Sequence, residues 1–309
     1  CVYLLVRKIA QPLNSLRLTM ERVAEGAIHS RYLPQRWGFE VNAIGKYFNE
    51  TLDALLLHQK QAEAERMKRE KLAQELQLGQ EIQTGLLPRE FPLIRDLDIG
   101  AGCLQAKEVG GDFYDVFPLS SGKILIVVAD LAGKGISACL FSLGLRSSLR
   151  ALAETTDNLS QLLKKANDLF LLDAGDSGEF ATLWLGLLEK RTLHYASLGH
   201  PPALLKRGEA LQELSTHHPA LGLMPFSAVR SHSQTLETGD ALLIYTDGVT
   251  EAHDAAKQMY GIERLKQSFL DCKEPTASVA AEQILQDVQS FSQDVPQHDD
   301  LTLLLIQVL

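Results

Sequence analysis

The stretch VGGDFYDVFPLSSGKILIVVADLAGKG (residues 109–135) contains the most apolar strand-like run of the chain, KILIVVAD, which ends on Asp130. A second acidic motif, GGDFYD, lies about one strand's length before it. Carboxylates beside glycines at strand ends indicate a metal or phosphate site, although ordinary turn residues give the same pattern. The rest of the sequence decides between these interpretations.

Short strand-like segments and a few helical segments follow residue 89. The strand-like segments are DIGAGCL, ILIVVAD, TLWLGLL, LHYASL, ALLIYTD and LTLLLIQVL. Residues 136–153, 159–172 and 276–291 are expected to form helices. Because strands outnumber helices and do not strictly alternate with them, the pattern predicts an α+β fold, a β-sandwich flanked by helices, over a parallel doubly wound sheet.

The composition limits the classes of partner. The chain has 309 residues, of which 45% are apolar, enough for two domains or for one large domain with an appendage. Its formal net charge is −9 and it has no basic stripe with interleaved aromatic residues, so no nucleic-acid partner is expected. Its four cysteines lie far apart, so neither a disulfide framework nor a zinc site is expected.

Two heptad seams occupy the N-terminal part. The first consists of Ile9, Leu13, Leu16, Met20 and Val23, and the second of Val41, Ile44, Phe48, Leu52 and Leu55. A polar connector with Pro34 and Gly38 joins them. Two such short helices cannot bury both apolar faces alone, so a dimeric four-helix bundle is expected, with a plain helical hairpin as the alternative.

The segments before and after this pair of helices also have patterns that predict structure. The chain opens with CVYLLV and then Arg7 and Lys8, as at the cytoplasmic end of a transmembrane helix, although a frayed N-terminus gives the same pattern. Residues 53–87 predict one continuous helix, because they are rich in helix formers and contain no proline. A dimeric coiled coil is favoured there over a solvated single helix.

Acidic residues recur at strand edges and turns. They are Asp112 and Asp115 in GGDFYD, Asp130 in VVADLAG, Asp247 in LLIYTDG, and Asp299 and Asp300 in QHDDLTLLL. If the strands that they adjoin are neighbours, the carboxylates converge at one rim of the sheet. Oxygen ligands without cysteine or clustered histidine favour Mg²⁺ or Mn²⁺. Four or five such carboxylates can hold two ions and support attack on a phosphoryl group, whereas each acid alone is better explained as a turn residue.

Several other motifs are weaker. LAGKG lacks the upstream glycine and the hydroxyl residue of a P-loop, and GGDFYD has Phe-Tyr where GGDEF cyclases have an acidic pair. His200 in GHPP is expected to shape a turn rather than to act as a general acid. Lys134 and Arg146 are expected to be solvated, and Asp115 to support the site or to cap a strand.

The N-terminal segment IAQPLNSL…VAEG…FEVNAIGKYFNETL resembles a HAMP domain, a module that relays signals from membrane helices in bacterial receptors. The matching positions are Pro12, Gly26, Glu40 and Phe48-Asn49. The family often has Asp-Glu where this chain has Phe39-Glu40. The boundaries that follow are the end of a transmembrane helix at residues 1–6, a HAMP domain at 7–55 and a coiled-coil signalling linker at 56–88.

Almost all of residues 75–309 is similar to the SpoIIE/RsbU branch of the PPM serine/threonine phosphatases. The matching motifs, in order, are EIQTGLLP, VGGDFYD, AD-x-x-GKG, FATLWLGLL, LGHPPALL, ALGL, GDALLIYTDGVTEA with YGIERL, and DDLTLL. The resemblance implies a PPM-type β-sandwich, the phosphatase domain, at residues 89–309. One departure is Ala132, where the family usually has serine.

The resemblance also implies roles for residues. Asp112 would bind one of two Mn²⁺ or Mg²⁺ ions, and Asp130 would bridge both with help from the Leu131 carbonyl. Asp247 and Asp299 would hold the other ion. Asp300 would be a supporting residue, since the wider family often has Asn there. The ions would activate water for direct attack on phosphoserine or phosphothreonine.

The implied function is a protein serine/threonine phosphatase that dephosphorylates a STAS-domain anti-sigma-factor antagonist in a bacterial partner-switching pathway. The implied assembly is a homodimer through the HAMP domain and coiled coil, anchored in the membrane, at the cytoplasmic face of the bacterial inner membrane. The alternatives are a non-catalytic signalling scaffold of the same fold that binds the phosphoprotein, and a nucleotide-binding module. The complete set of four acids favours the enzyme over the scaffold.

Overall fold

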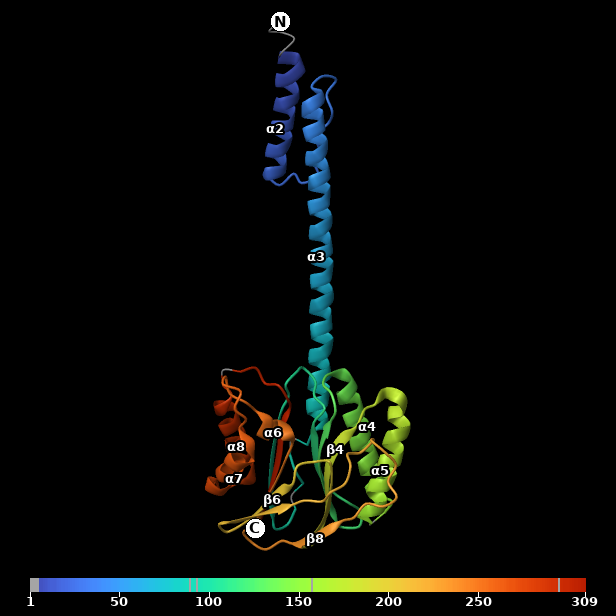
Figure 1. Ribbon diagram of the computed structural model, residues 1–309, viewed down its shortest axis with the longest axis vertical. Helices are drawn as coiled ribbons and strands as arrows, with labels where there is room; N and C mark the ends of the chain where they lie inside the picture. Colours follow the sequence, from blue (N-terminus) through green and yellow to red (C-terminus); the bar gives the residue numbers. More distant parts are fainter. Residues whose placement is uncertain (1–5, 89, 93, 157, 294) are drawn as a thin grey trace. The chain divides into compact units, whose positions relative to one another are not determined.

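The computed structural model describes residues 6–88, 90–92, 94–156, 158–293 and 295–309 (Figure 1). Residues 1–5 of the predicted end of a transmembrane helix therefore lie outside the described residues. The chain divides into two compact units, Cys1–Glu75 and Leu76–Leu309, and each is described by itself.

The first unit is helical. Its elements are the π-helical turn η1 (Val6–Ala10), α2 (Gln11–Ala24) and the N-terminal part of α3 (Phe39–Leu86). Pro12 lies in the first turn of α2, and Gly26 follows its end with a φ of 103°. The predicted second seam helix and the predicted linker helix form one element, because α3 continues without interruption to Leu86.

Tyr32 in the connector between these helices is the centre of the first unit's core. It is buried with Leu16 and Val41. The Asn49 side chain accepts a hydrogen bond from the Tyr32 N–H and donates one to the Tyr32 carbonyl, both at 2.9 Å. A Cβ at Gly45 would lie 2.0 Å from the Tyr32 ring, so the ring packs where α3 has no side chain.

Gly45→Ala is therefore expected to destabilise the first unit by about 1–3 kcal/mol, because the new methyl group would overlap the Tyr32 ring. Gly85→Ala in the same helix is the matched control, since a Cβ there meets nothing within 4 Å. This control should stabilise α3 by up to about 1 kcal/mol through helix propensity. Far-UV circular dichroism during heating measures both, and equal melting of the two variants would contradict the packing argument.

The second unit is a sandwich of two five-stranded sheets, which confirms the predicted α+β fold. One sheet has the order β1-β10-β9-β6-β7 and the other β2-β3-β4-β5-β8, with antiparallel neighbours throughout. The strands are β1 (Leu97–Leu104), β2 (Phe113–Pro118), β3 (Ile124–Leu131), β4 (Ala181–Glu189), β5 (Thr192–Leu198), β6 (Ala203–Arg207), β7 (Ala210–Leu214), β8 (His232–Thr235), β9 (Ala241–Tyr245) and β10 (Leu301–Val308).

Helices cover the outer face of each sheet (Figure 1). They are α4 (Ile136–Ala153) and α5 (Leu159–Ala174) on the β2–β3 side, and α7 (Gly261–Asp271) and α8 (Ala277–Phe291) on the β1–β10 side. The short elements η2 (Gly175–Ser177) and α6 (Asp247–Glu251) complete the unit. A strand covered on both faces needs apolar residues on both, which explains the unbroken apolar runs of β3 and β10.

The strand β10 shows this double burial directly. Leu304 and Ile306 belong to the core between the sheets, whereas Leu303 and Leu305 belong to the core under α7 and α8. In the described part of the chain, α4 alone is long and apolar enough to cross a membrane by length and composition. Its face with Leu145 is buried in the core of the sandwich, as expected of a core helix.

Candidate active site

Two pairs of neighbouring strands bring the predicted acids together. In one sheet, β2 pairs with β3 so that Phe113 lies opposite Ala129. Asp112, directly before β2, therefore lies beside Asp130, the last residue but one of β3. The antiparallel register of this pair thus fixes the first two carboxylates next to each other.

The second pair of strands lies in the other sheet. Strands β9 and β10 pair so that Tyr245 lies opposite Leu303. Asp247, the first residue of α6, follows β9, and Asp299 precedes β10. The acids thus converge at the ends of strands from both sheets. The condition for one shared rim of a single sheet, that the strands they adjoin are all neighbours, is not met, because β3 and β9 belong to different sheets.

The carboxylates of this acid cluster (Asp112, Asp130, Asp247 and Asp299) repel one another. Burial raises the pKa of Asp112 well above its ordinary value, and Asp130 raises it further. Burial, with Asp247 as the next cause, raises the pKa of Asp130 to about 7. Burial and Asp299 raise the pKa of Asp247. A divalent cation among these oxygens would favour the ionised forms, so the donor set fits Mg²⁺ or Mn²⁺.

The orientations of the side chains are set by other partners. Thr246 Oγ1 donates to Asp112 Oδ2 at 2.8 Å. Asp299 Oδ1 accepts from the Asp300 N–H at 2.9 Å, and its Oδ2 lies 3.0 Å from Lys134 Nζ. Among the described residues, no three His, Cys, Asp or Glu side chains are placed as ligands of one ion.

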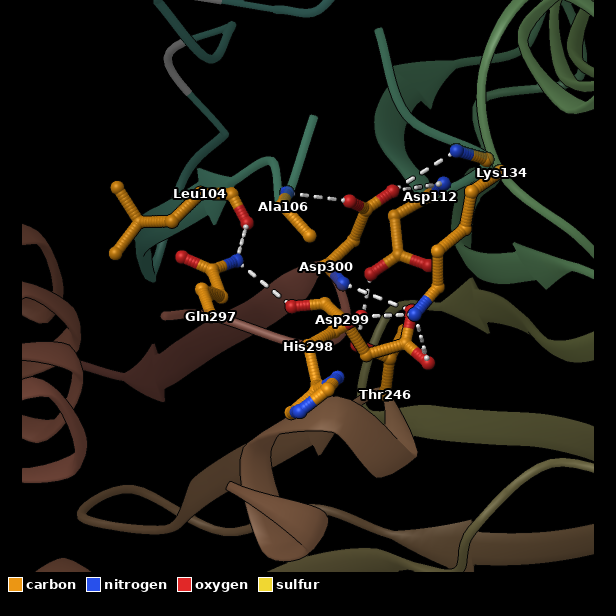
Figure 2. A network of polar contacts seen from close by, with 10 residues as sticks. Leu104, Ala106, Asp112, Lys134, Thr246, Gln297, His298, Asp299 and Asp300 are labelled. Carbon is orange, nitrogen blue, oxygen red and sulfur yellow. Dashed lines mark hydrogen bonds and ion pairs between the residues drawn. The ribbon is translucent and has the colours of Figure 1, made fainter. Parts of the chain in front are cut away.

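Asp300 holds the loop that carries Asp112 (Figure 2). Its Oδ1 accepts from the Ala106 N–H at 2.8 Å, and its Oδ2 accepts from the Gly111 N–H at 2.9 Å. A Cβ at Gly110 would lie 2.1 Å from that Oδ2, so only glycine lets the loop approach this closely. These contacts suit the supporting role that the sequence predicted for Asp300.

The sequence did not assign a role to Gln83, although this residue lies in the EIQTGLLP motif. Its side chain is buried near the end of α3. Gln83 Nε2 donates to the Gly110 carbonyl at 2.8 Å, and its Oε1 accepts from the Gly110 N–H at 3.1 Å and from Gln105 Nε2 at 2.8 Å. The end of α3 therefore fixes the peptide two residues before Asp112. The sequence offered one signal for this role, which is an amide side chain near the end of a helix whose neighbouring residues are exposed.

Gln297 is a second residue with a role that the sequence did not reveal. Its Nε2 donates to the Leu104 carbonyl at 2.6 Å and to the Asp299 carbonyl at 2.7 Å, as Figure 2 shows. Because Leu104 ends β1, Gln297 ties the loop with Asp299 to the neighbouring strand. No motif predicted this contact, since it depends on strand order.

Asp115 does not join the acid cluster. It is fully buried, and Arg150 Nε and Nη2 donate to its two oxygens at 2.7 and 2.8 Å. Arg146 Nε lies 2.9 Å from Asp115 Oδ2. The expectation that Arg146 is solvated is wrong, because α4 presents both arginines to this carboxylate.

His200 is a structural residue, as its Gly-His-Pro-Pro context predicted. Its Nδ1 lies 2.8 Å from Thr182 Oγ1, and its carbonyl accepts from Ser197 Oγ at 2.7 Å. Burial lowers the pKa of His200 to about 3. The imidazole is therefore neutral at neutral pH and cannot serve as a general acid there.

The comparisons with known proteins agree with this geometry. The family model of stage II sporulation protein E (SpoIIE) matches residues 120–309, more than half of the chain. The chain belongs to the SpoIIE family. The HAMP domain model matches residues 4–56, which confirms the resemblance of the N-terminal segment.

Two relatives of known name align with most of the chain. Phosphoserine phosphatase RsbU of Bacillus subtilis is 29% identical over 251 residues, which cover 77% of this chain and 71% of RsbU. Protein IcfG of Synechocystis sp. is 28% identical over 268 residues, 75% of this chain and 41% of IcfG. The chain thus spans less than half the length of IcfG.

Solved structures show the same fold. The SiaA-PP2C domain of Pseudomonas aeruginosa superposes with a TM-score of 0.69 and 21% identity, covering 78% of this chain and 97% of that domain. The PP2C phosphatase domain of SpoIIE from Bacillus subtilis gives 0.60 and 20%, covering 69% and 63%. The second unit therefore has the PP2C fold, and one relative of the chain, RsbU, is named a phosphoserine phosphatase.

Proposed function

We propose that this chain is a metal-dependent protein serine/threonine phosphatase whose substrate is a phosphorylated STAS-domain anti-sigma-factor antagonist. The observation that supports this most is the convergence of Asp112, Asp130, Asp247 and Asp299 from both sheets into one acid cluster. The relative named phosphoserine phosphatase RsbU supports a phosphoserine substrate.

The proposed metal ligands form two groups, one from each pair of strands. Asp112 would hold one ion and Asp247 with Asp299 the other, while Asp130, helped by the Leu131 carbonyl, would be shared. When bound, two Mn²⁺ or Mg²⁺ ions would supply a water of lowered pKa and positive charge to offset the phosphoryl oxygens. The chain's own contribution is to hold the carboxylates in place, through Thr246 at Asp112 and Asp300 at the adjacent loop.

The proposed organisation keeps the boundaries drawn from the sequence. Residues 7–55 would form the HAMP domain, 56–88 the coiled-coil linker and 89–309 the phosphatase domain. The HAMP domain and the linker would make a homodimer and pass a signal from a membrane anchor. The protein would then work at the cytoplasmic face of the bacterial inner membrane.

A cluster of aromatic and basic residues in the first unit supports a position beside the membrane. Trp37 is 46% exposed and Phe39 84% exposed. Lys8 Nζ lies 5.2 Å from the centroid of a Trp37 ring, and the Arg36 guanidinium lies 5.6 Å from it. A Cβ at Gly38 would lie 2.9 Å from the Lys8 carbonyl, so the connector ends beside the start of the helical unit. Aromatic and basic side chains of this kind favour the bilayer–water interface.

The test is phosphate release by the full chain from a STAS-domain protein phosphorylated on serine. Release is expected with Mn²⁺ or Mg²⁺, should stop on addition of EDTA and should return when metal is restored. The small ester para-nitrophenyl phosphate is assayed in parallel, because it needs no partner recognition. Hydrolysis of the ester without hydrolysis of the phosphoprotein would contradict the partner alone, whereas failure with both would favour the non-catalytic scaffold.

A further inference from the structure

Lys134 places an ammonium group beside Asp299, one member of the acid cluster (Figure 2). Its Nζ lies 3.0 Å from Asp299 Oδ2 and also donates to the His298 carbonyl. Burial and Asp299 raise the pKa of Asp247, and the charge of Lys134 opposes that rise. The ammonium therefore acts electrostatically on both acids that come from the β9–β10 pair.

The backbone around Lys134 permits movement of this group. Lys134 lies between Gly133 and Gly135, whose φ angles are 89° and 93°, in the turn between β3 and α4. The side chain of Lys134 is 29% exposed and that of Asp299 is 41% exposed. A long flexible lysine in contact with solvent can leave its partner without leaving a buried charge behind.

Lys134 and a divalent cation would compete for the same carboxylate. Asp299 Oδ1 already accepts from the Asp300 N–H, so Oδ2 is the oxygen engaged by Lys134. Mg²⁺ needs direct contact with carboxylate oxygens at about 2.0–2.1 Å. An ammonium and a divalent ion at one oxygen repel each other strongly at such a separation. Asp299 can therefore offer Oδ2 to the ion only when Lys134 moves away from it.

We propose that Lys134 is an internal counter-ion of the acid cluster, which competes with the divalent cation for Asp299 and so weakens metal binding. The proposal rests on the proposed metal site. Lys134 is a positioning residue in this account, because it acts through Asp299. By bridging Asp299 and the His298 carbonyl, it also holds the loop before β10 against the turn after β3.

The test is Mn²⁺ binding to the full-length chain by isothermal titration calorimetry. Lys134→Met keeps the length of the side chain and removes its charge, so its Kd for Mn²⁺ is expected to fall roughly three- to tenfold below the wild-type value. Lys134→Arg keeps the charge and should bind near the wild-type Kd. Lys165→Met on α5 is the matched control, an exposed lysine without a carboxylate partner among the described residues, and should leave Kd unchanged.

Two readouts separate the remaining outcomes. The rise in melting temperature on addition of Mn²⁺ should be larger for Lys134→Met than for the wild type, because at a given concentration a ligand with a lower Kd stabilises the folded state more. A wild type that binds Mn²⁺ and a Lys134→Met variant with equal or weaker affinity would overturn the counter-ion proposal alone. A wild type that binds no Mn²⁺ would overturn the proposed metal site and this inference with it.

Discussion

Asp130→Asn is expected to lower metal-dependent phosphate release by at least about a thousandfold, which corresponds to about 4 kcal/mol of transition-state stabilisation. Asp130 lies beside Asp112 in its own sheet and interacts with Asp247 from the other. Asp130 therefore interacts with an acid from each of the two strand pairs. An asparagine keeps the shape but loses the charge that a shared metal ligand needs.

The same substitution is not expected to harm the fold. Because it removes one of several like charges from a partly buried cluster, the variant should melt in EDTA at or above the wild-type temperature. Asp173→Asn on the exposed face of α5 is the matched control and should change neither activity nor melting. Initial rates with saturating Mn²⁺ measure the effect, and an Asp130→Asn protein with more than a tenth of wild-type activity would contradict the assignment.

The sequence predicted best those elements whose pattern is set by their own burial. Helix α4 has the predicted limits, and the long apolar strands β3 and β10 were expected because strands covered on both faces are apolar throughout. The strands β2, β6, β7 and β8 were missed. Strands β7, ALQEL, and β8, HSQT, lie at sheet edges and are largely exposed, whereas β2 and β6 are mostly buried but have only six and five residues. Helix α7 was missed because only Leu265 and Phe269 mark its buried face.

The candidate site divides in the same way. Its acids stand in local motifs, so the sequence could name them one by one. Their partners depend on which strands become neighbours, and periodicity carries no information about that. Lys134 and Arg146 look alike in the sequence, yet one reaches Asp299 across the sheets and the other pairs with Asp115 beneath α4. The role of Gln83 likewise depends on where the end of α3 docks.

Asp115→Ala is expected to lower the free energy of unfolding of the second unit by about 3–5 kcal/mol. The substitution removes the negative partner of a buried ion pair and leaves the positive partners uncompensated. Arg150 binds both oxygens of Asp115, and Arg146 lies 2.9 Å from one of them. Without the carboxylate, two guanidinium groups of α4 face each other. The Arg146 side chain is only 11% exposed, so water can offer it little compensation.

Urea unfolding followed by the fluorescence of Trp184 measures this loss, since Trp184 is fully buried in β4 of the same unit. Asp168→Ala is the matched control: it breaks an exposed pair with Lys164 on α5 and should cost less than about 0.5 kcal/mol. Replacing Asp115, Arg146 and Arg150 together by apolar residues should recover most of the stability, because no unpaired charge then remains. Equal losses in Asp115→Ala and in this triple variant would mean that packing, rather than the uncompensated charge, dominates at this position.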